Sequence, residues 1–236
     1  MRTNDLVVGE ADTLRLSPEE RRIDVALLSE KVYRKLRDAI NSGIFKPHGH
    51  LVQNDLAAKL GVSRTPVREA LFRLSHEGLV RSVGGRGFVV EDVTWHDVEE
   101  VYVVRRALEL QAVALLPEDY PVQDLQTLRR LNETLARPDI DPAEYYELNR
   151  LFHRAVIEPA NNDLLKRMLD EVWELPVSHR IFRGYTLSGA GVSRMISEHQ
   201  AILAAAEAND RALLAHLVDR HLMEAQHETI TWLRER

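Results

Sequence analysis

The feature that constrains this chain most is a change of sequence pattern near residues 92–94. Before it, short apolar stretches alternate with turns that contain glycine or proline, which is typical of small helices and strands. After it, apolar residues recur at three- and four-residue spacing almost to the C-terminus, which indicates helices. We therefore expect a mainly α protein, with a mobile tail at residues 1–22, a first domain at 23–92 and a helical domain at 93–236.

In the first domain, the spacing of apolar residues predicts three helices and two short strands. The helices are expected at residues 25–42, 53–60 and about 63–77, and the strands at 79–83 and 87–93. The second and third helices are joined by the sequence Leu-Gly-Val-Ser, and the strands by Gly-Gly-Arg-Gly. This order is typical of a helix-turn-helix followed by a small β-wing.

The third predicted helix combines an apolar stripe with polar residues in its first turns. Arg64, Thr65 and Arg68 project away from the stripe, as a DNA recognition helix requires. Arginine can contact guanine with two hydrogen bonds, and a helix N-terminus attracts phosphate. Arg86, at the tip of the wing, could enter a minor groove. The pattern alone also allows a small helical domain with surface arginines.

The charge of the chain is unevenly distributed. The formal net charge is -6, yet residues 30–91 contain 11 Lys and Arg against 6 Asp and Glu, or +5, which leaves -11 for the rest. A basic module on an acidic remainder indicates that one segment faces a polyanion.

Composition excludes several other classes of protein. No apolar run is long enough to span a bilayer, and the first twenty residues lack the apolar core of a signal peptide. With no cysteine there are no disulfides and no thiolate metal sites. We expect a cytoplasmic protein with no membrane partner.

The region after residue 94 predicts an antiparallel bundle of about six or seven helices. Thr94 and Asp97 have the spacing of a capping box, which would begin the first of them. Breaks are expected where proline, glycine or asparagine interrupts the pattern, at Pro117, 138–142, 159–162, 184–191 and Asn209.

Polar residues stand out on three helices of the predicted bundle. Asn149 and His153 are four residues apart and share a helix face. His199 and His221 lie on two later helices. The three histidines could converge on a metal ion, or each could be buried with an ordinary hydrogen-bond partner.

The N-terminal run LVQNDLAAKLGVSRTPVREALFRLSHEGLVRSVGGRGFVV resembles the winged helix-turn-helix of the GntR family of bacterial regulators, over residues 27–91. The resemblance implies a DNA-binding regulator that reads an inverted-repeat operator as a homodimer. The residues that would face DNA are Ser63, Arg64, Thr65, Arg68, Arg86 and Gly87. Asn54 falls where several members carry a DNA-contacting arginine.

Residues 96–234 resemble the helical effector domain (FCD type) of the FadR branch of that family. The matching segments are VRRALELQAVALL, LNRLFHRAVIEPANNDLL and EHQAILAAAEANDRALLAHLVDRHL. Many such domains bind a divalent metal with one Asp and three His, which here fall on Asn149, His153, His199 and His221. Imidazole ligands suit Zn²⁺ or Ni²⁺, and Mn²⁺ is a further candidate. Asn in place of Asp would weaken metal binding or change its selectivity.

The resemblance also implies a small-molecule effector. Three neutral histidines and an amide leave the charge of a divalent ion uncompensated, so we expect a small organic acid or sugar acid. Arg105 resembles a position that lines the effector pocket, although Arg105 and Glu109 also have the spacing of a surface ion pair.

The expected function is therefore a dimeric DNA-binding repressor and not an enzyme. One alternative is a regulator whose bundle only dimerises. Another is a metalloenzyme, for which Glu198 is the nearest acid or base in sequence. As the neighbour of His199 on a helix, Glu198 would point about 100° away from it.

Overall fold

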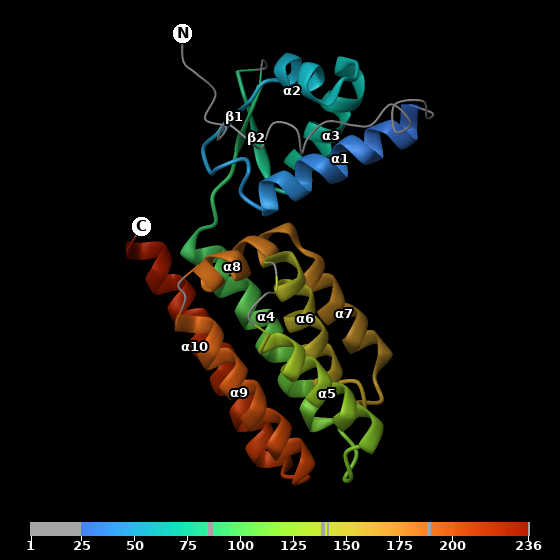
Figure 1. Ribbon diagram of the computed structural model, residues 1–236, viewed down its shortest axis with the longest axis vertical. Coiled ribbons are helices and arrows are strands. Elements are labelled where there is room, and N and C mark those ends of the chain that lie inside the picture. Colours follow the sequence, from blue (N-terminus) through green and yellow to red (C-terminus); the bar gives the residue numbers. More distant parts are fainter. Residues whose placement is uncertain (1–24, 85–86, 138–139, 141, 188–189, 236) are drawn as a thin grey trace. The chain divides into compact units, whose positions relative to one another are not determined.

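The computed structural model describes residues 25–84, 87–137, 140, 142–187 and 190–235. These residues form two compact units that divide between Asp92 and Val93 (Figure 1), and each unit has its own hydrophobic core. The division coincides with the change of sequence pattern. The expected tail at residues 1–22 and Arg86 lie outside the described residues.

Three helices form most of the N-terminal unit: α1 (Val25–Asn41), α2 (Gln53–Leu60) and α3 (Arg64–His76). All three follow the predicted ranges to within a residue or two. Gly61 ends α2 with a φ of 69°, which permits the sharp turn into α3 because glycine has no Cβ to clash. The helix-turn-helix predicted from the sequence is thus present.

A three-stranded antiparallel sheet completes this unit, in the order β1 (His50–Leu51), β3 (Gly87–Val90), β2 (Val80–Val83). Val83 pairs with Gly87 across the turn of the wing. A Cβ added to Gly87 would lie 3.3 Å from the carbonyl oxygen of Leu51, so the strands approach closely there. The strand β1 was not predicted, because two residues carry no detectable alternation, and β3 ends three residues earlier than expected.

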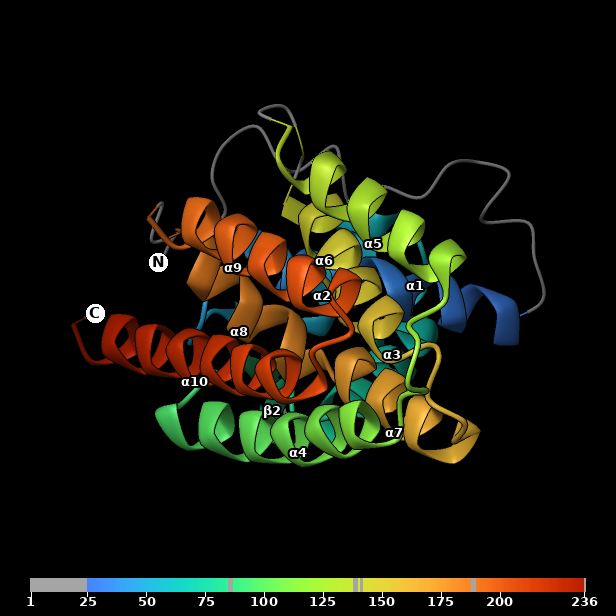
Figure 2. The same ribbon diagram turned by 90° about the horizontal axis from the view of Figure 1, so that it is seen from below.

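The C-terminal unit consists of seven helices within the described residues. They are α4 (Trp95–Ala114), α5 (Val122–Leu135), α6 (Pro142–Val156), α7 (Asp163–Glu174), α8 (Pro176–Leu187), α9 (Ala190–Glu207) and α10 (Arg211–Glu235). Helix α10 packs along α4 and α9, while α5 packs along α6 and α9 (Figure 2). The mainly α fold with a helical bundle is therefore confirmed. None of the helices in the described ranges has the length and apolar character needed to cross a bilayer.

Two details of the predicted bundle were wrong. The chain breaks between α7 and α8 at Leu175, whose ψ of 132° is extended because the next residue is Pro176. The break expected from residue 184 starts later, because α8 continues through Gly184 to Leu187. A single glycine inside a helix costs only about 1 kcal/mol relative to alanine, so neighbouring turns can carry it.

The first helix of the bundle begins at a complete capping box. The Oγ1 of Thr94 accepts a hydrogen bond from the Asp97 backbone N–H at 3.2 Å, and the Thr94 N–H donates to Asp97 Oδ2 at 2.7 Å. This confirms the predicted capping box. It fixes where the bundle begins, directly after the wing strand and its short exit segment.

Replacing Thr94 with Ala should lower the free energy of unfolding of the bundle by about 0.5–2 kcal/mol, because the Asp97 N–H loses its acceptor and the hydroxyl no longer donates to Asp97 Oδ2. Urea unfolding followed by circular dichroism would measure it. The Thr94→Ser variant keeps the hydroxyl and should remain near wild type. Equal losses for both variants would show that the methyl group matters and the cap does not.

Candidate metal centre and nucleic-acid interface

Three buried histidines meet inside the bundle. His153 comes from α6, His199 from α9 and His221 from α10, and each is at most 4% exposed. One ring nitrogen from each lies within 4.8 Å of the others. The Nε2 atoms of His153 and His221 are 3.2 Å apart. The structure therefore brings together the three histidines singled out in the sequence.

The ring of His153 contacts a buried ion pair on α4. Its Nδ1 lies 2.7 Å from Glu109 Oε2, and Arg105 Nε donates to Glu109 Oε1 at 3.0 Å. Burial by itself would raise the pKa of Glu109, but the charges and hydrogen bonds of His153 and Arg105 outweigh it and hold the pKa at about 2. Burial lowers the pKa of His153 to about 4, against the opposing effect of Glu109. Glu109 is therefore ionised, and His153 is neutral at pH 7.

His221 has a matching carboxylate on α9. Its Nδ1 lies 2.6 Å from Glu198 Oε2, and Glu198 Oε1 lies 3.3 Å from Arg194 Nε. Glu198 is thus occupied with orienting His221.

His199 lacks such a partner. It is fully buried, and neither ring nitrogen has a hydrogen-bond partner among the described residues. Its ring stacks on Phe152, with centroids 3.8 Å apart and planes 6° from parallel. Burial lowers the pKa of His199 well below 6.5, and the nearby His221, His153 and Arg105 lower it further. Asn149, one turn before His153, is 3% exposed, and its Oδ1 also lacks a partner.

These residues fit a divalent metal ion. Burying a polar atom without a hydrogen-bond partner costs free energy. Asn149 Oδ1 and both ring nitrogens of His199 are buried in this way. Two nitrogens that each lie about 2.0–2.1 Å from zinc are roughly 3.0–3.4 Å apart. The 3.2 Å between the Nε2 atoms of His153 and His221 lies in this range.

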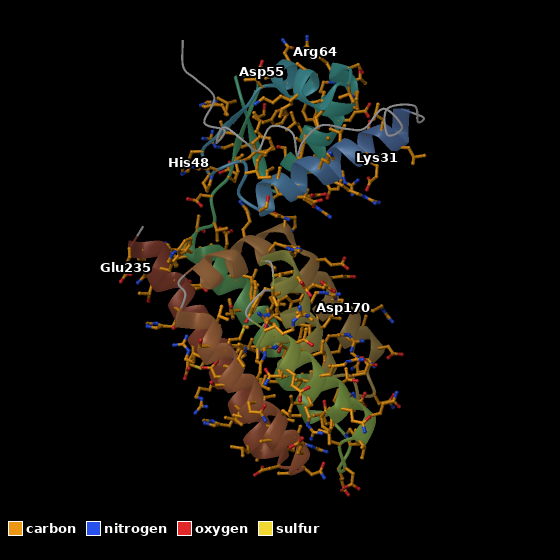
Figure 3. All side chains as sticks on the ribbon, in the orientation of Figure 1. Lys31, His48, Asp55, Arg64, Asp170 and Glu235 are labelled. Carbon is orange, nitrogen blue, oxygen red and sulfur yellow. The ribbon has the colours of Figure 1, made fainter. Side chains whose placement is uncertain are left out.

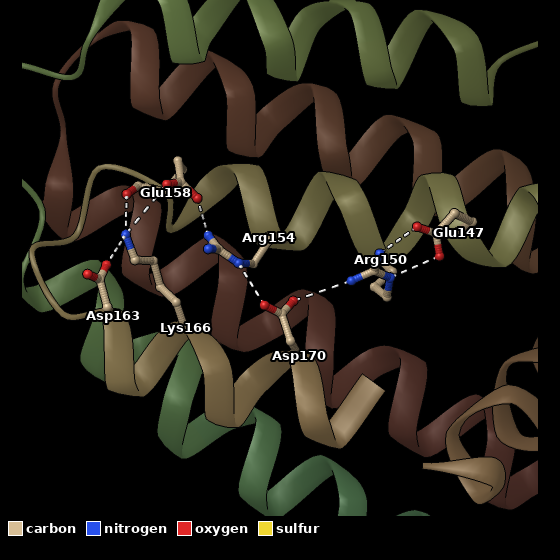
Figure 4. A network of polar contacts seen from close by, with 7 residues as sticks. All are labelled: Glu147, Arg150, Arg154, Glu158, Asp163, Lys166 and Asp170. Atoms are coloured by element: carbon tan, nitrogen blue, oxygen red, sulfur yellow. Dashed lines mark hydrogen bonds and ion pairs between the residues drawn. The ribbon is translucent and has the colours of Figure 1, made fainter. Parts of the chain in front are cut away.

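The outer side of α6 is tied to α7 by charged residues (Figure 4). The carboxylate of Asp170 lies 3.3 Å from both Arg150 and Arg154, one turn apart on α6. Lys166 lies 3.0 Å from Asp163 and 3.5 Å from Glu158. The network restrains the rotation of α6, on which Asn149 and His153 lie about 100° away from the two arginines and are buried.

The structure corrects one sequence interpretation and shows two contacts that were missed. Arg105 and Glu109 do form an ion pair, but it is buried, with Arg105 6% exposed and lying 4.0 Å from the Trp173 ring. The contacts of Glu109 with His153 and of Glu198 with His221 were not expected. A usable signal existed, since an arginine precedes each glutamate by four residues, at 105/109 and 194/198.

The residues expected to face DNA lie on the surface of the N-terminal unit. Arg64, Thr65 and Arg68 are exposed on α3, and Arg64 points outward (Figure 3). Asn54 is exposed on α2. The other face of α3 is buried through Val67, Ala70, Leu71 and Leu74.

Ser63 occupies the N-cap position of α3 but makes no capping hydrogen bond through its side chain. The N-terminal N–H groups of α3 therefore remain available to an anion, since the first turn of a helix has no internal acceptors for them.

Comparison with protein families assigns each unit separately. The model of the gntR family of bacterial regulatory proteins matches residues 28–90, and the FCD domain model matches residues 100–224.

Individual relatives agree with this assignment. The HTH-type transcriptional regulator McbR of Escherichia coli K12 is 32% identical over 193 residues, which covers 80% of this chain and 86% of that protein. The HTH-type transcriptional repressor RspR of the same strain is 24% identical over 219 residues, or 88% and 91% of the two chains.

Solved structures share the fold. The structure of E. coli McbR/YncC has a TM-score of 0.62 at 29% identity and covers 89% of this chain and 98% of that one. A GntR regulator from Rhodococcus sp. RHA1 has a TM-score of 0.68 at 24% identity, covering 86% and 97%. The relatives are transcriptional regulators and not enzymes, which sets aside the metalloenzyme alternative. The chain belongs to the GntR family of bacterial regulatory proteins and is a transcriptional regulator whose C-terminal bundle is an FCD domain.

Proposed function

We propose that this regulator binds an inverted-repeat operator as a homodimer, represses transcription from it, and releases it when a small carboxylate binds at a divalent metal in the bundle. The observation that carries this proposal is the convergence of His153, His199 and His221 in the core of a domain joined to a DNA-reading unit. A bundle that served only to dimerise would have no use for unpartnered buried imidazole and amide groups.

The DNA contacts are proposed for the exposed first turns of α3. Arg64, Thr65 and Arg68 are positioned for base edges, while Ser63 and the free N–H groups of α3 suit a phosphate. Asn54 on α2 is proposed as a further contact. Gly87, with Arg86 before it in sequence, would bring the wing to the duplex. Two such units related by a twofold axis would read an inverted repeat.

Replacing Arg68 with Ala should weaken binding to the selected operator by roughly 1–3 kcal/mol if the side chain reads a base. Fluorescence anisotropy at several salt concentrations would measure both the affinity and its salt dependence. A base-reading role leaves the salt slope unchanged, whereas a phosphate contact lowers it by about one.

The matched control is Arg130→Ala, which removes an exposed arginine from α5 of the other unit. It should bind the operator like the wild type. If both variants bind equally well, or if selection from random duplexes yields no inverted repeat, the proposed DNA contacts are wrong.

The proposed dimer would use an apolar surface of the bundle. Helices α4 and α7 pack together, and both leave large apolar side chains exposed. On α4 these are Val103 (60% exposed) and Val104, with Leu115 directly after the helix, and on α7 they are Leu164 (60% exposed) and Met168. Apolar surface shared by neighbouring helices is typical of an interface between chains.

The metal ligands are proposed to be Asn149, His153, His199 and His221. A divalent ion bound there would act as a Lewis acid that accepts an oxygen of the effector. The rest of the site is supplied by the chain: Glu109 and Glu198 orient two of the rings, and Phe152 stacks on the third.

Replacing His199 and His221 together with Ala should abolish binding of one zinc ion per chain, because half of the four ligands are lost. Elemental analysis after dialysis against zinc would measure the content. The melting temperature should no longer rise with added zinc, since a ligand stabilises only the state that binds it.

His216→Ala is the control, because His216 lies exposed on α10 outside the cluster. It should keep the metal. Asn149→Asp should bind zinc more tightly than the wild type, since it adds a negative charge to a neutral ligand set. A wild-type protein with no metal after such dialysis would contradict the proposal.

The effector is proposed to be a small hydroxy acid or sugar acid. The buried carboxylate beside His153, Glu109, is paired with Arg105 and so does not offset a divalent charge. Glu198, beside His221, shares Arg194 with Glu224 and Glu228, and a single carboxylate offsets at most half of that charge. An anionic ligand would offset it. Arg105 has five N–H donors and donates Nε to Glu109 Oε1, while its buried Nη2 makes no hydrogen bond among the described residues, which leaves donors for a second carboxylate oxygen.

Calorimetry with a panel of hydroxy acids and sugar acids should show binding to the zinc-loaded protein and none to the stripped protein. The matching amides, which lack the charge, serve as controls. An acid that weakens operator binding tenfold must itself bind the operator complex tenfold more weakly, a coupling of about 1.4 kcal/mol. Equal binding of acid and amide, or of loaded and stripped protein, would refute the mechanism.

A further inference from the structure

Two helices of the bundle carry the same three-part arrangement. On α4, Arg105 precedes Glu109 by four residues, and on α9 Arg194 precedes Glu198 by four. Each glutamate contacts a histidine on a different helix. Glu109 lies 2.7 Å from the Nδ1 of His153 on α6, and Glu198 lies 2.6 Å from the Nδ1 of His221 on α10.

The contacts determine where each ring carries its hydrogen. An ionised carboxylate can only accept hydrogen bonds, so the facing Nδ1 must be the protonated nitrogen. In a neutral ring the Nε2 is then a lone-pair donor. The Nε2 atoms of His153 and His221 face each other at 3.2 Å, which places both lone pairs where a shared cation would bind.

The arginines hold the two carboxylates in place. Arg105 Nε donates to Glu109 Oε1 at 3.0 Å, on the oxygen that does not face the histidine. Arg194 Nε lies 3.3 Å from Glu198 Oε1, the oxygen that does not face His221, and Arg194 is shared with Glu224 and Glu228. Glu109 is therefore hydrogen-bonded through one oxygen and Glu198 is ion-paired through one oxygen, and each carboxylate orients a ring with its other oxygen.

The third histidine differs from these two. His199 contacts no carboxylate among the described residues, and the stacked ring of Phe152 is its chief support. The ring orientation of His199 is set by packing, while its tautomer is left free.

We propose that Glu109 and Glu198 are positioning residues that hold His153 and His221 as Nδ1–H tautomers and thereby set the affinity of the metal site. The inference rests on the metal site of the proposed function. Outer carboxylates of this kind change metal affinity by about 10- to 100-fold when they are replaced. Glu109→Gln and Glu198→Gln should each weaken zinc binding by a factor in this range.

The affinity is measured by competition with a chromophoric zinc chelator, using the full-length protein. Glu207→Gln is the matched control, because Glu207 lies on α9 like Glu198 and is also paired with an arginine, Arg129, while no histidine contact of Glu207 is found in the part of the chain that the structure describes. It should bind zinc as the wild type does. Equal zinc affinity of Glu198→Gln and Glu207→Gln would overturn the proposal.

A second measurement needs no substitution and reports the tautomers directly. Side-chain ¹⁵N–¹H correlation spectra of the zinc-loaded wild type should show hydrogen on the Nδ1 of His153 and His221. A bare Nδ1 on either ring would overturn the tautomer assignment even if zinc binds. In the metal-free protein both Nδ1 atoms should also carry hydrogen. If they do and no zinc binds, the metal function fails while the tautomer assignment stands.

Discussion

The bundle is organised around the free-energy cost of placing three imidazoles in an apolar interior. Burial removes water from these rings, and it lowers the pKa of His153 and His199, so these two rings are neutral donors at pH 7. A buried ring N–H needs a hydrogen-bond acceptor, and Glu109 accepts from the Nδ1 of His153. The buried charge of Glu109 is in turn compensated by Arg105. Arg105 therefore compensates Glu109, and Glu109 orients the ring of His153.

Helix α6 is held both by the buried cluster and by charged residues nearer the surface. The inward face of this helix carries Asn149 and His153, while its outward face is pinned to Asp170 of α7 by two arginines. The charged network and the buried cluster thus constrain the same helix from two directions, about 100° apart around its axis. Surface ion pairs individually contribute little to the free energy of unfolding. Here their main effect is to restrain the rotation of α6, which keeps Asn149 and His153 buried together.

Much of this architecture was predictable from the sequence, and the missing parts have physical explanations. The spacing of apolar residues predicted the recognition helix and most helices of the bundle, because this spacing repeats over many residues. It could not find β1, which is two residues long, or the break at Pro176 between two apolar helices. The three histidines were identified as candidates, but their convergence depends on tertiary packing. The spacing of Arg105 and Glu109 indicated an ion pair, but not that the pair is buried or that Glu109 contacts His153, because both depend on tertiary packing.

Burial of the three histidines also has a kinetic consequence. Their exposed fractions lie between 0 and 4%, and they come from three different helices. An ion held among them could leave only when those helices separate, so its exchange would be slow and would follow the opening of the core. Such an ion would not track short-lived changes in metal concentration. It would be a resident part of the domain, and the rapid signal would have to come from the molecule that binds beside it.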